Sequence, residues 1–501
     1  RTSYRTKNID FVRMSGMQTT TVDPVPSPPQ ETIIIATAPP PEPRKPAVTT
    51  NNRGYFTRIN KQNYASYTVF FLFIYGGMDM AASLGWSQPY SVLLFTEYSY
   101  CWFVGVIIGA LATTLTMSFL PKLVYYVFGA LMQLTGSIIF TAADYSACLA
   151  ARYLAGLGIG LITVPFLIHN AEVASNNLRG VNGGMEQCGL ALGIFFQVIF
   201  TTEWTSLIDS NPNEIHGIIG IVVSLFGLAM TALVVESPIF FLRRNMENRA
   251  QQSQEKLLRH NPGGVSAALK EARRYVAESD NRTLGEELVA SVMPFLKMLL
   301  FRCFVAFSFS LPLTMSIISS TAVAEKGLSL WPIYLFGVLR VIGVMVALIF
   351  LDTLGRKAVS LVGLLVMAGL MLGLAGLYAN VTNLISFNLM TSACNIALAF
   401  QVFAGLFVCS SSAYMGEAFP MRVKSFLVGV IVIIEQIVHI VVIACVSSVP
   451  NKDFFFQYFL AVGIIMLVGM IFFTVSMPET KKMTLRKAGH RFQKWYDVQM
   501  Y

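Results

Sequence analysis

Five charged residues stand inside long apolar stretches of the sequence: Asp79, Arg152, Glu186, Arg340 and Glu435. A charge at the centre of a helix in lipid costs about 2.5–3.5 kcal/mol, so each of these side chains should have a partner or a task. A carboxylate that pairs with a guanidinium through charge-assisted hydrogen bonds can exchange that partner for a proton or a polar solute. Ion pairing, proton transfer and solute binding are therefore the chemistry that these residue types favour.

Depth along the apolar runs predicts which of these charges can meet. Asp79 and Arg152 both fall about 10–13 Å below the outer surface at 1.5 Å per residue, so we expect them to pair. Glu435 lies about 15 Å from the cytoplasmic end of its run and Arg340 at a similar depth, which predicts a second pair near the midplane. This second pair fits either a structural ion pair or a site for a charged or zwitterionic solute. Glu186 is shallower and is expected to face the inner vestibule.

The composition defines the elements that must position these charges. Of 501 residues, 54% are hydrophobic and 13% are charged, and this charged share is about half of the usual one. The apolar residues form runs of about 20, the length of a helix that crosses a bilayer. We therefore predict an all-α polytopic membrane protein with about twelve transmembrane helices. They are expected near residues 66–87, 99–118, 123–142, 147–169, 184–204, 216–235, 294–319, 331–351, 357–378, 385–413, 425–447 and 454–476.

The distribution of proline and charge divides the chain into five parts. Residues 1–62 are polar and proline-rich, which predicts a disordered cytoplasmic arm. Six-helix bundles are expected at 63–235 and 294–477, separated by a cytoplasmic insert at 236–293 and followed by a cytoplasmic tail at 478–501. Lys and Arg gather in the arm, the insert and the tail, which is the positive-inside pattern. The net charge of +9 is thereby explained without a nucleic-acid partner.

The two predicted bundles repeat their motifs at a nearly constant offset. Glu236 and Glu479, which each close an apolar run, are 243 residues apart, and Glu172 and Glu417 are 245 residues apart. Two parallel six-span halves would produce this spacing, because each would end its even spans on the cytoplasmic face. The repeated carboxylates are therefore expected at the inner surface of both halves.

Guanidiniums close to these carboxylates suggest latches that hold the inner side closed. The expected pairs are Asp352 with Arg356, Glu172 with Arg179, and Glu417 with Arg422. The alternative is that these residues are solvated interfacial charges that set topology and contribute little energy.

Glycines and histidines have simpler interpretations. Gly156, Gly158 and Gly160 in the fourth span favour close packing between helices, and no strand precedes them as a dinucleotide loop would require. The histidines are expected at helix ends or in loops, apart from His439, which lies one helical turn from Glu435. The helix-end or loop histidines are His169, His216, His260 and His490.

Five motifs resemble the signatures of the sugar porter family of the major facilitator superfamily. They are residues 152–180 (RYLAGLGIGLITVPFLIHNAEVASNNLRG), 236–238 (ESP), 352–357 (DTLGRK), 416–422 (GEAFPMR) and 478–481 (PETK). The resemblance implies a major facilitator fold of two bundles that rock around a central site, short helices in the insert, and cytoplasmic termini. It also implies a sugar transporter-like carrier of a small polar solute, and it leaves uniport and proton symport open.

The resemblance also implies roles for individual residues. Asp79 aligns with the acidic position of proton-coupled sugar porters and Arg152 with its arginine partner, although a static structural pair remains an alternative. Gln187 matches the fifth-span glutamine that hydrogen-bonds sugar hydroxyls. Thr314 and Arg340 occupy cavity positions of the seventh and eighth spans, and Glu435 is a charged addition to this predicted substrate site. The gating set consists of Glu172, Arg179, Glu236, Asp352, Arg356, Glu417, Arg422 and Glu479.

The sequence departs from the family pattern where a sugar should bind. The seventh span reads AFSFSLPLTMSII in place of a glutamine-rich motif, and a serine near Ser411 or Ser412 replaces a tryptophan of the tenth span. Two alternatives therefore stay open, a non-transporting solute sensor or scaffold and a carrier for a charged or zwitterionic solute.

No nucleophile–base set, metal cluster or phosphate loop is found in the sequence. We therefore expect no enzymatic activity and no cofactor. The expected partners are the lipid bilayer, a small polar solute and, in the case of symport, protons. The plasma membrane is the expected location, and the oligomeric state stays open.

Overall fold

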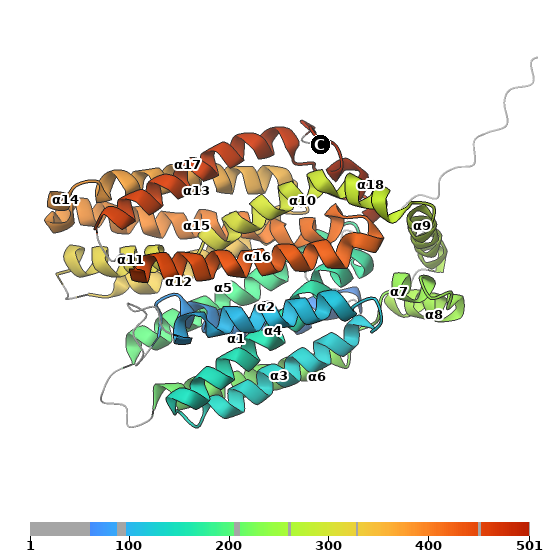
Figure 1. The fold of residues 1–501 in the computed structure, drawn as a ribbon, viewed down its shortest axis with the longest axis horizontal. Helices are drawn as coiled ribbons and strands as arrows, with labels where there is room; N and C mark the ends of the chain where they lie inside the picture. The colour runs from blue at the N-terminus through green and yellow to red at the C-terminus, as the bar shows by residue number, and fades with distance from the viewer. Residues whose placement is uncertain are drawn as a thin grey trace, which may run out of the picture. The chain divides into compact units, whose positions relative to one another are not determined.

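The computed structural model describes residues 61–87, 97–204, 211–258, 262–326, 329–448 and 452–499, and within these ranges it contains helices and loops but no strand. Twelve helices of this part are long and apolar enough to cross a membrane. The predicted all-α, twelve-span architecture is therefore confirmed (Figure 1). The predicted disordered arm, residues 1–62, lies outside the described residues except for its last two positions.

The first half of the chain supplies six membrane-crossing helices. Their ends follow local sequence signals: the Asp144 side chain accepts a hydrogen bond from the Ser146 amide (3.1 Å) before α4, and Pro212 opens α6, where its missing amide proton costs nothing. The helices are α1 (Tyr64–Ser83), α2 (Glu97–Thr116), α3 (Lys122–Phe140), α4 (Tyr145–Val173), α5 (Arg179–Glu203) and α6 (Pro212–Thr231).

The second half supplies the other six spans, and its first span is divided. Ser308, Phe309 and Ser310 separate the two pieces of this seventh span, which begins at Leu284, ten residues before the predicted start at 294. The helices are α10 (Leu284–Phe307) with α11 (Leu311–Ala324), α12 (Trp331–Phe350), α13 (Arg356–Tyr378), α15 (Phe387–Ala418), α16 (Met421–Ser448) and α17 (Lys452–Ser476), while α14 (Val381–Ile385) is a short connecting helix.

The same helix pairings occur in both halves. In the first half α2 packs on α4, α3 on α4 and α6, and α1 on α5; in the second half α12 packs on α15, α13 on α15 and α17, and α10 on α16. Between the halves, α2 packs on α16 and α5 on α12, which are again equivalent pairs. The repeat inferred from the spacing of the glutamates is therefore a repeat of two parallel bundles.

Glycines allow the closest of these helix contacts. A Cβ on Gly156 of α4 would lie 2.2 Å from the carbonyl oxygen of Trp102 on α2. A Cβ on Gly193 of α5 would lie 1.9 Å from the carbonyl oxygen of Ile74 on α1. Neither position has room for a side chain because the obstacle is backbone. The predicted packing role of the glycines in the fourth span is thus confirmed at Gly156.

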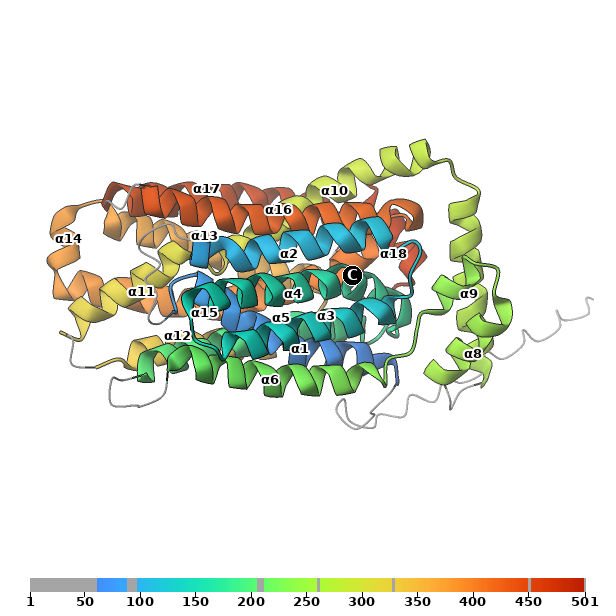
Figure 2. The ribbon, with the colours of Figure 1, turned by 60° about the horizontal axis from the view of Figure 1, so that its bottom comes forward.

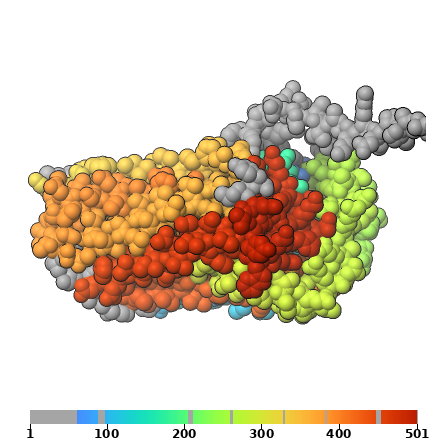
Figure 3. Space-filling model, turned by 90° about the horizontal axis from the view of Figure 1, so that it is seen from above, coloured from blue at the N-terminus to red at the C-terminus, as the bar shows by residue number. Residues whose placement is uncertain are grey.

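Four short or amphipathic helices gather at one end of the bundles. Figure 1 shows α7, α8 and α9 beyond this end, Figure 2 shows α8 and α9 there, and Figure 3 shows the C-terminal segment beside the insert. Because these segments carry the basic residues that the positive-inside rule assigns to the cytoplasm, we call this the inner end. The helices are α7 (Pro238–Leu242), α8 (Glu247–Leu257), α9 (Pro262–Asp280) and α18 (Leu485–Phe492).

Candidate functional site

A narrow cavity of about 40 Å³ lies between the two halves. Side chains of α1, α2, α4 and α5 line it from the first half, and those of α10, α12 and α16 line it from the second. The lining residues are Phe73, Met80, Trp102, Val106, Ile159, Thr163, Glu186, Gln187, Leu190, Ile194, Arg302, Val305, Arg340, Glu435, Gln436 and His439. The cavity thus combines an apolar wall with convergent polar groups, as small-molecule sites do.

Three charged residues form a buried cluster at this cavity. Arg302 Nε lies 2.9 Å from Glu435 Oε2, and Arg302 Nη2 lies 3.6 Å from Glu186 Oε1. Ser411 accepts a hydrogen bond from Arg302 (3.2 Å), and Ser412 donates one to Glu186 (2.6 Å). One guanidinium therefore joins carboxylates of both halves, and two serines of the tenth span form hydrogen bonds with this cluster.

The prediction that Arg340 pairs with Glu435 is wrong, because Glu435 forms its ion pair with Arg302 instead. Sequence reasoning missed Arg302, although the predicted start of the seventh span at residue 294 already placed it about 12 Å inside the span, a depth similar to that of Asp79 and Arg152. The signal was present, since Arg302 interrupts the apolar run MLLFRCFVAF. The same cluster shows that Glu186 lines the central cavity instead of facing an inner vestibule alone.

Arg340 binds neutral acceptors. Its Nη1 donates to the Ser308 carbonyl oxygen (3.0 Å) and to Gln401 Oε1 (3.1 Å), and its Nη2 donates to Ser308 Oγ (3.2 Å). Its guanidinium lies 5.2 Å from the ring centre of Phe309. No carboxylate of the described residues lies within ion-pairing distance of Arg340. Arg340 therefore binds the non-helical segment between α10 and α11 through Ser308, and it presents a positive charge to the cavity.

Two other predicted substrate residues differ in their placement. Gln187 lines the cavity, as expected for a residue that contacts solute. Thr314 lies on α11, where its methyl carbon is 2.9 Å from the position that a Cβ on Gly85 would take. The structure therefore places Thr314 against the outer end of α1 and does not bring it to the cavity wall. His439 lines the cavity and stacks on Phe103, with 4.9 Å between ring centres.

Asp79 and Arg152 meet, as their depths predicted. Arg152 Nη1 lies 3.3 Å from Asp79 Oδ1, and both side chains are completely buried. Arg152 Nη2 donates to the Asp79 carbonyl oxygen (3.0 Å) and to the Ser83 hydroxyl. The guanidinium also lies 4.4 Å from the ring centre of Tyr98. This pair lies within the first half, where α1 and α4 hold it.

His216 is a third member of this group; it lies near a helix end, as predicted, but its contact with Asp79 was not expected. His216 Nε2 lies 3.2 Å from Asp79 Oδ1, and Nδ1 lies 3.1 Å from Gln197 Oε1. His216 is near the start of α6, but Gly217, Gly220 and other small residues of that helix pack against neighbouring helices. That small-residue face was the signal that a histidine beside it would be buried.

A second ion network closes the inner end of the two halves. Glu417 of α15 accepts from Arg179 of the first half (2.9 Å) and from Arg356 of the second half (2.5 Å). Asp352 accepts from the backbone amides of Gly180 (3.2 Å) and Val181 (2.9 Å) at the start of α5. These contacts join the halves below the cavity, and we call them the inner latch.

Opposing effects act on the ionisation of the Asp352 carboxyl in the inner latch. Burial raises the pKa of the Asp352 carboxyl above its usual value, although Arg356 and the amides of Gly180 and Val181 favour the ionised form. Arg356 Nη2 lies 3.5 Å from Asp352 Oδ1, so this predicted pair is confirmed.

The other two predicted pairs are wrong. Glu172 binds Lys122 (2.9 Å) instead of Arg179, because Arg179 crosses to Glu417. Arg422 lies 3.7 Å from Asp280, and both side chains are well exposed. The two errors differ in cause: Arg179 binds Glu417 of the other half, whereas Arg422 turns to Asp280 of the insert. Arg422 therefore fits the alternative of a solvated interfacial charge.

The repeated glutamates of the two halves perform the same local task. Glu236 accepts from the amide of Leu123 (3.1 Å), the second residue of α3. Glu479 accepts from the amide of Lys357 (2.9 Å), the second residue of α13. Each carboxylate satisfies an amide at the start of the third span of its half, where the helix dipole also favours negative charge. This equivalence explains why the chain repeats the motif.

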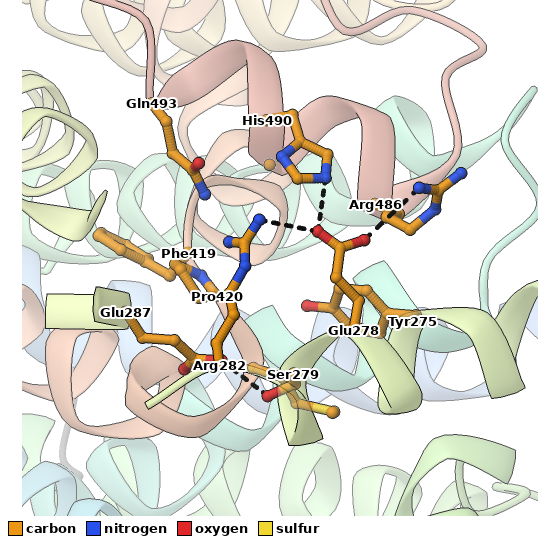
Figure 4. Close-up of a pocket in the computed structure, with 12 residues that line it drawn as sticks. Tyr275, Glu278, Ser279, Arg282, Glu287, Phe419, Pro420, Arg486, His490 and Gln493 are labelled. Atoms are coloured by element: carbon orange, nitrogen blue, oxygen red, sulfur yellow. Dashed lines mark hydrogen bonds and ion pairs between the residues drawn. The ribbon is translucent and has the colours of Figure 1, made fainter. Parts of the chain in front are cut away.

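The insert and the tail are tied together by a further carboxylate at the inner end (Figure 4). Glu278 of α9 lies 2.7 Å from His490 and 3.5 Å from Arg486, both on α18, and 3.0 Å from Arg282. Ser279 beside it donates to Glu287 of α10 (2.8 Å). These contacts fasten α9 and α18 below the bundles. They are part of the scaffold that surrounds the inner latch.

Contacts also join the halves at the outer end of the cavity. The Tyr334 hydroxyl of α12 donates to Glu203 of α5. The rings of Trp86 and Phe336 face each other with 6.0 Å between their centres. Together with the inner latch, these contacts join the halves at both ends of the cavity. Two bundles, a central cavity and contacts at both ends define a membrane transporter of the alternating-access type.

Comparison with known proteins identifies the family. The family model "Sugar (and other) transporter" matches residues 49–492, and the chain belongs to this family. The probable metabolite transport protein CsbC of Bacillus subtilis is 23% identical over 68% of this chain and 73% of its own length. The glucose transporter GlcP of Staphylococcus epidermidis is 22% identical over 78% of this chain and 86% of its own length.

Solved structures share the fold. The proton:xylose symporter XylE of the major facilitator superfamily, bound to 6-bromo-6-deoxy-D-glucose, superposes with a TM-score of 0.68 at 16% identity and covers 85% of this chain and 98% of its own. An inward-open conformation of XylE from E. coli covers 85% and 97% at 16% identity with a TM-score of 0.56. The chain is thus an integral, multi-pass, sugar transporter-like protein and not an enzyme, and the alternatives of a non-transporting sensor or scaffold and of a carrier for a charged or zwitterionic solute are not favoured.

Proposed function

We propose that this protein carries a sugar across the plasma membrane by alternating access and couples that movement to protons. The observation that carries the proposal is the central cavity, which both halves line and which contacts close at its inner and outer ends. A solute in this cavity is released to one side only when the contacts at that side open. The names of two relatives, a glucose transporter and a proton:xylose symporter, support a sugar as the solute.

Gln187, Arg340 and Glu435 bind the solute in this proposal. Gln187 offers a donor and an acceptor, Glu435 offers acceptors, and Arg340 offers donors, and all three line the cavity. Sugar hydroxyls need such convergent groups, and Trp102 adds an aromatic wall. Thr314 stays outside this set because it packs at the outer end of α1. Arg302 positions Glu435 and Glu186 through its ion pairs.

The inner latch is the gate that must open for release to the cytoplasm. Arg179, Asp352, Arg356 and Glu417 hold it directly. Glu172, Glu236 and Glu479 support it from the helix ends, while Arg422 contributes little because it is solvated. Both termini are cytoplasmic in this proposal, since the basic arm, insert and tail belong to one side.

Asp79 and Arg152 couple protons to this cycle. Gain or loss of a proton by a buried carboxylate changes the contacts that α1 makes with its neighbouring helices. The pair is completely buried at 3.3 Å, so a change of its charge state has a large energetic effect.

Counterflow in proteoliposomes tests the proposal. Vesicles loaded with unlabelled glucose or xylose should transiently accumulate the same labelled sugar, because a carrier exchanges solute across the membrane. Gln187→Ala should reduce this exchange about tenfold or more, the loss expected when buried hydrogen bonds to a ligand disappear. Binding of sugar without trans-stimulated uptake would contradict a carrier and favour a sensor.

A further inference from the structure

The orientation of Gln197 determines which nitrogen of His216 carries a proton. Gln197 Nε2 donates to the carbonyl oxygen of Trp86 (2.8 Å) and to Thr201 Oγ1 (3.2 Å). A backbone carbonyl can only accept, so this end of the amide must be the NH₂ group. The Gln197 oxygen therefore faces His216 Nδ1 at 3.1 Å. An oxygen at this distance requires a hydrogen on Nδ1.

The opposite nitrogen then faces a carboxylate. His216 Nε2 lies 3.2 Å from Asp79 Oδ1. If the imidazole is neutral, its one hydrogen is on Nδ1, and the bare Nε2 can meet Oδ1 only when Asp79 is protonated. If Asp79 is ionised, Nε2 must carry a second hydrogen and the ring is an imidazolium. Both arrangements contain one proton more than a carboxylate beside a neutral imidazole.

The surroundings make this extra proton energetically important. The groups that face the pair are Arg152 from α4, Tyr75 from α1, whose ring centre is 5.2 Å from that of His216, and Phe140 from α3 at 4.8 Å. Tyr98 of α2 lies against Arg152. Asp79 Oδ2 is buried and has no hydrogen-bond partner among the described residues. The hydrogen bonds of this carboxylate are thus concentrated on Oδ1.

Loss of the proton would change the contacts between helices. Without it, the lone pairs of His216 Nε2 and Asp79 Oδ1 would face each other, and the hydrogen bond between α1 and α6 would disappear. Asp79 would keep its ion pair with Arg152 of α4. Protonation therefore determines whether Asp79 is bound to two helices or to one.

We propose that Asp79 and His216 together form the proton site of the carrier, and that the transported proton is shared between His216 Nε2 and Asp79 Oδ1. The proton arrives from water at one side, binds this pair, and returns to water at the other side. The inference rests on the proposed proton coupling and adds His216 to it as a residue that holds the proton.

His216→Gln tests the inference, because glutamine can donate to Asp79 but cannot hold a proton. The pH at which concentrative uptake is half-maximal should change, because the proton can then no longer be shared with an imidazole. His169→Gln is the matched control: this buried histidine contacts Tyr126 and the Val235 carbonyl, and its substitution should leave the midpoint unchanged.

An unchanged midpoint in His216→Gln would overturn the shared-proton site while leaving proton coupling by Asp79 intact. Wild-type protein that exchanges sugar but never concentrates it would overturn the proposed coupling and this inference with it. Nitrogen-15 NMR of the wild-type histidines gives a second test that needs no variant. A His216 ring with a hydrogen on Nδ1 is expected, and a neutral ring with its hydrogen on Nε2 alone would contradict the inference.

Discussion

Replacing Glu417 by glutamine should open the inner end of the carrier. Glu417 is the only carboxylate in the described ranges that contacts both Arg179 and Arg356, at 2.9 Å and 2.5 Å. Its side chain is completely buried. Glutamine preserves the shape of the side chain but removes the negative charge between two guanidiniums. The closed state then contains two buried positive charges that have lost their shared partner.

The size of the effect follows from this burial. Removing one partner of a buried ion pair costs about 3–5 kcal/mol, because the remaining charge stays buried without its counter-ion. Glutamine still offers one acceptor, so we expect the lower end, about 3 kcal/mol. Since 1.4 kcal/mol is a factor of ten, the ratio of inner-open to inner-closed molecules should rise about 100-fold. In the open state Arg179 and Arg356 become solvated, and the penalty largely disappears.

Cys409 provides the assay. It is buried on α15, and a Cβ on Gly184 of α5 would lie 3.6 Å from its Cβ, so it lies where the halves meet. Inner opening should expose Cys409 to a membrane-impermeant maleimide applied from the cytoplasmic side, and its labelling rate should rise in proportion to the open fraction. Arg422→Gln is the matched control because the Arg422 side chain is exposed. The labelling rate of Cys409 in this variant should equal that in the wild-type protein.

An unchanged labelling rate of Cys409 in Glu417→Gln would refute the reasoning. It would mean that the charges at the inner end are interfacial charges that set topology and do not hold the halves together. Equal increases in Glu417→Gln and Arg422→Gln would also contradict it, because the effect would then follow charge alone and not the contact between halves.

The remaining predictions concern the proton site and the helix packing. Asp79→Asn should abolish concentrative uptake in a pH gradient but spare counterflow, because a neutral amide cannot exchange a proton; uptake that still concentrates sugar in this variant would exclude Asp79 from coupling. Gly193→Ala should destabilise the protein by about 1–3 kcal/mol through overpacking, as its Cβ meets the Ile74 carbonyl at 1.9 Å. Gly376→Ala should not destabilise it, since nothing lies within 4 Å of that Cβ, and equal thermal stabilities of the two variants would contradict the packing argument.

The fold could be predicted because the membrane imposes strong rules on the sequence. Apolar runs of a fixed length, basic residues on one side and a motif repeated at a constant offset were sufficient to predict twelve spans in two parallel halves. Depth counted along one helix was also sufficient for Asp79 and Arg152, because both ends of their spans were well marked. Arg302 lies at a comparable depth of the predicted seventh span, but it was not among the charges recognised within the apolar runs.

Partners across the two halves could not be predicted from the sequence. Arg179 is seven residues from Glu172, and the sequence favours that local pair, but the rotation of α5 directs Arg179 to Glu417 of the other half. His216 was missed for a related reason. Its contact with Asp79 depends on how α6 packs against α1, and a single sequence contains no signal for that distance.

The division of the seventh span has a mechanical consequence. Arg302 lies on α10, which packs with α15 and α16, whereas α11 begins only after Ser308, Phe309 and Ser310. Arg340 is hydrogen-bonded to Ser308 at this joint. Because α11 is a separate helix, its direction is not fixed by that of α10, which carries Arg302 of the buried charge cluster. We therefore expect a change in the tilt of α11 to leave the ion pairs of Arg302 in place.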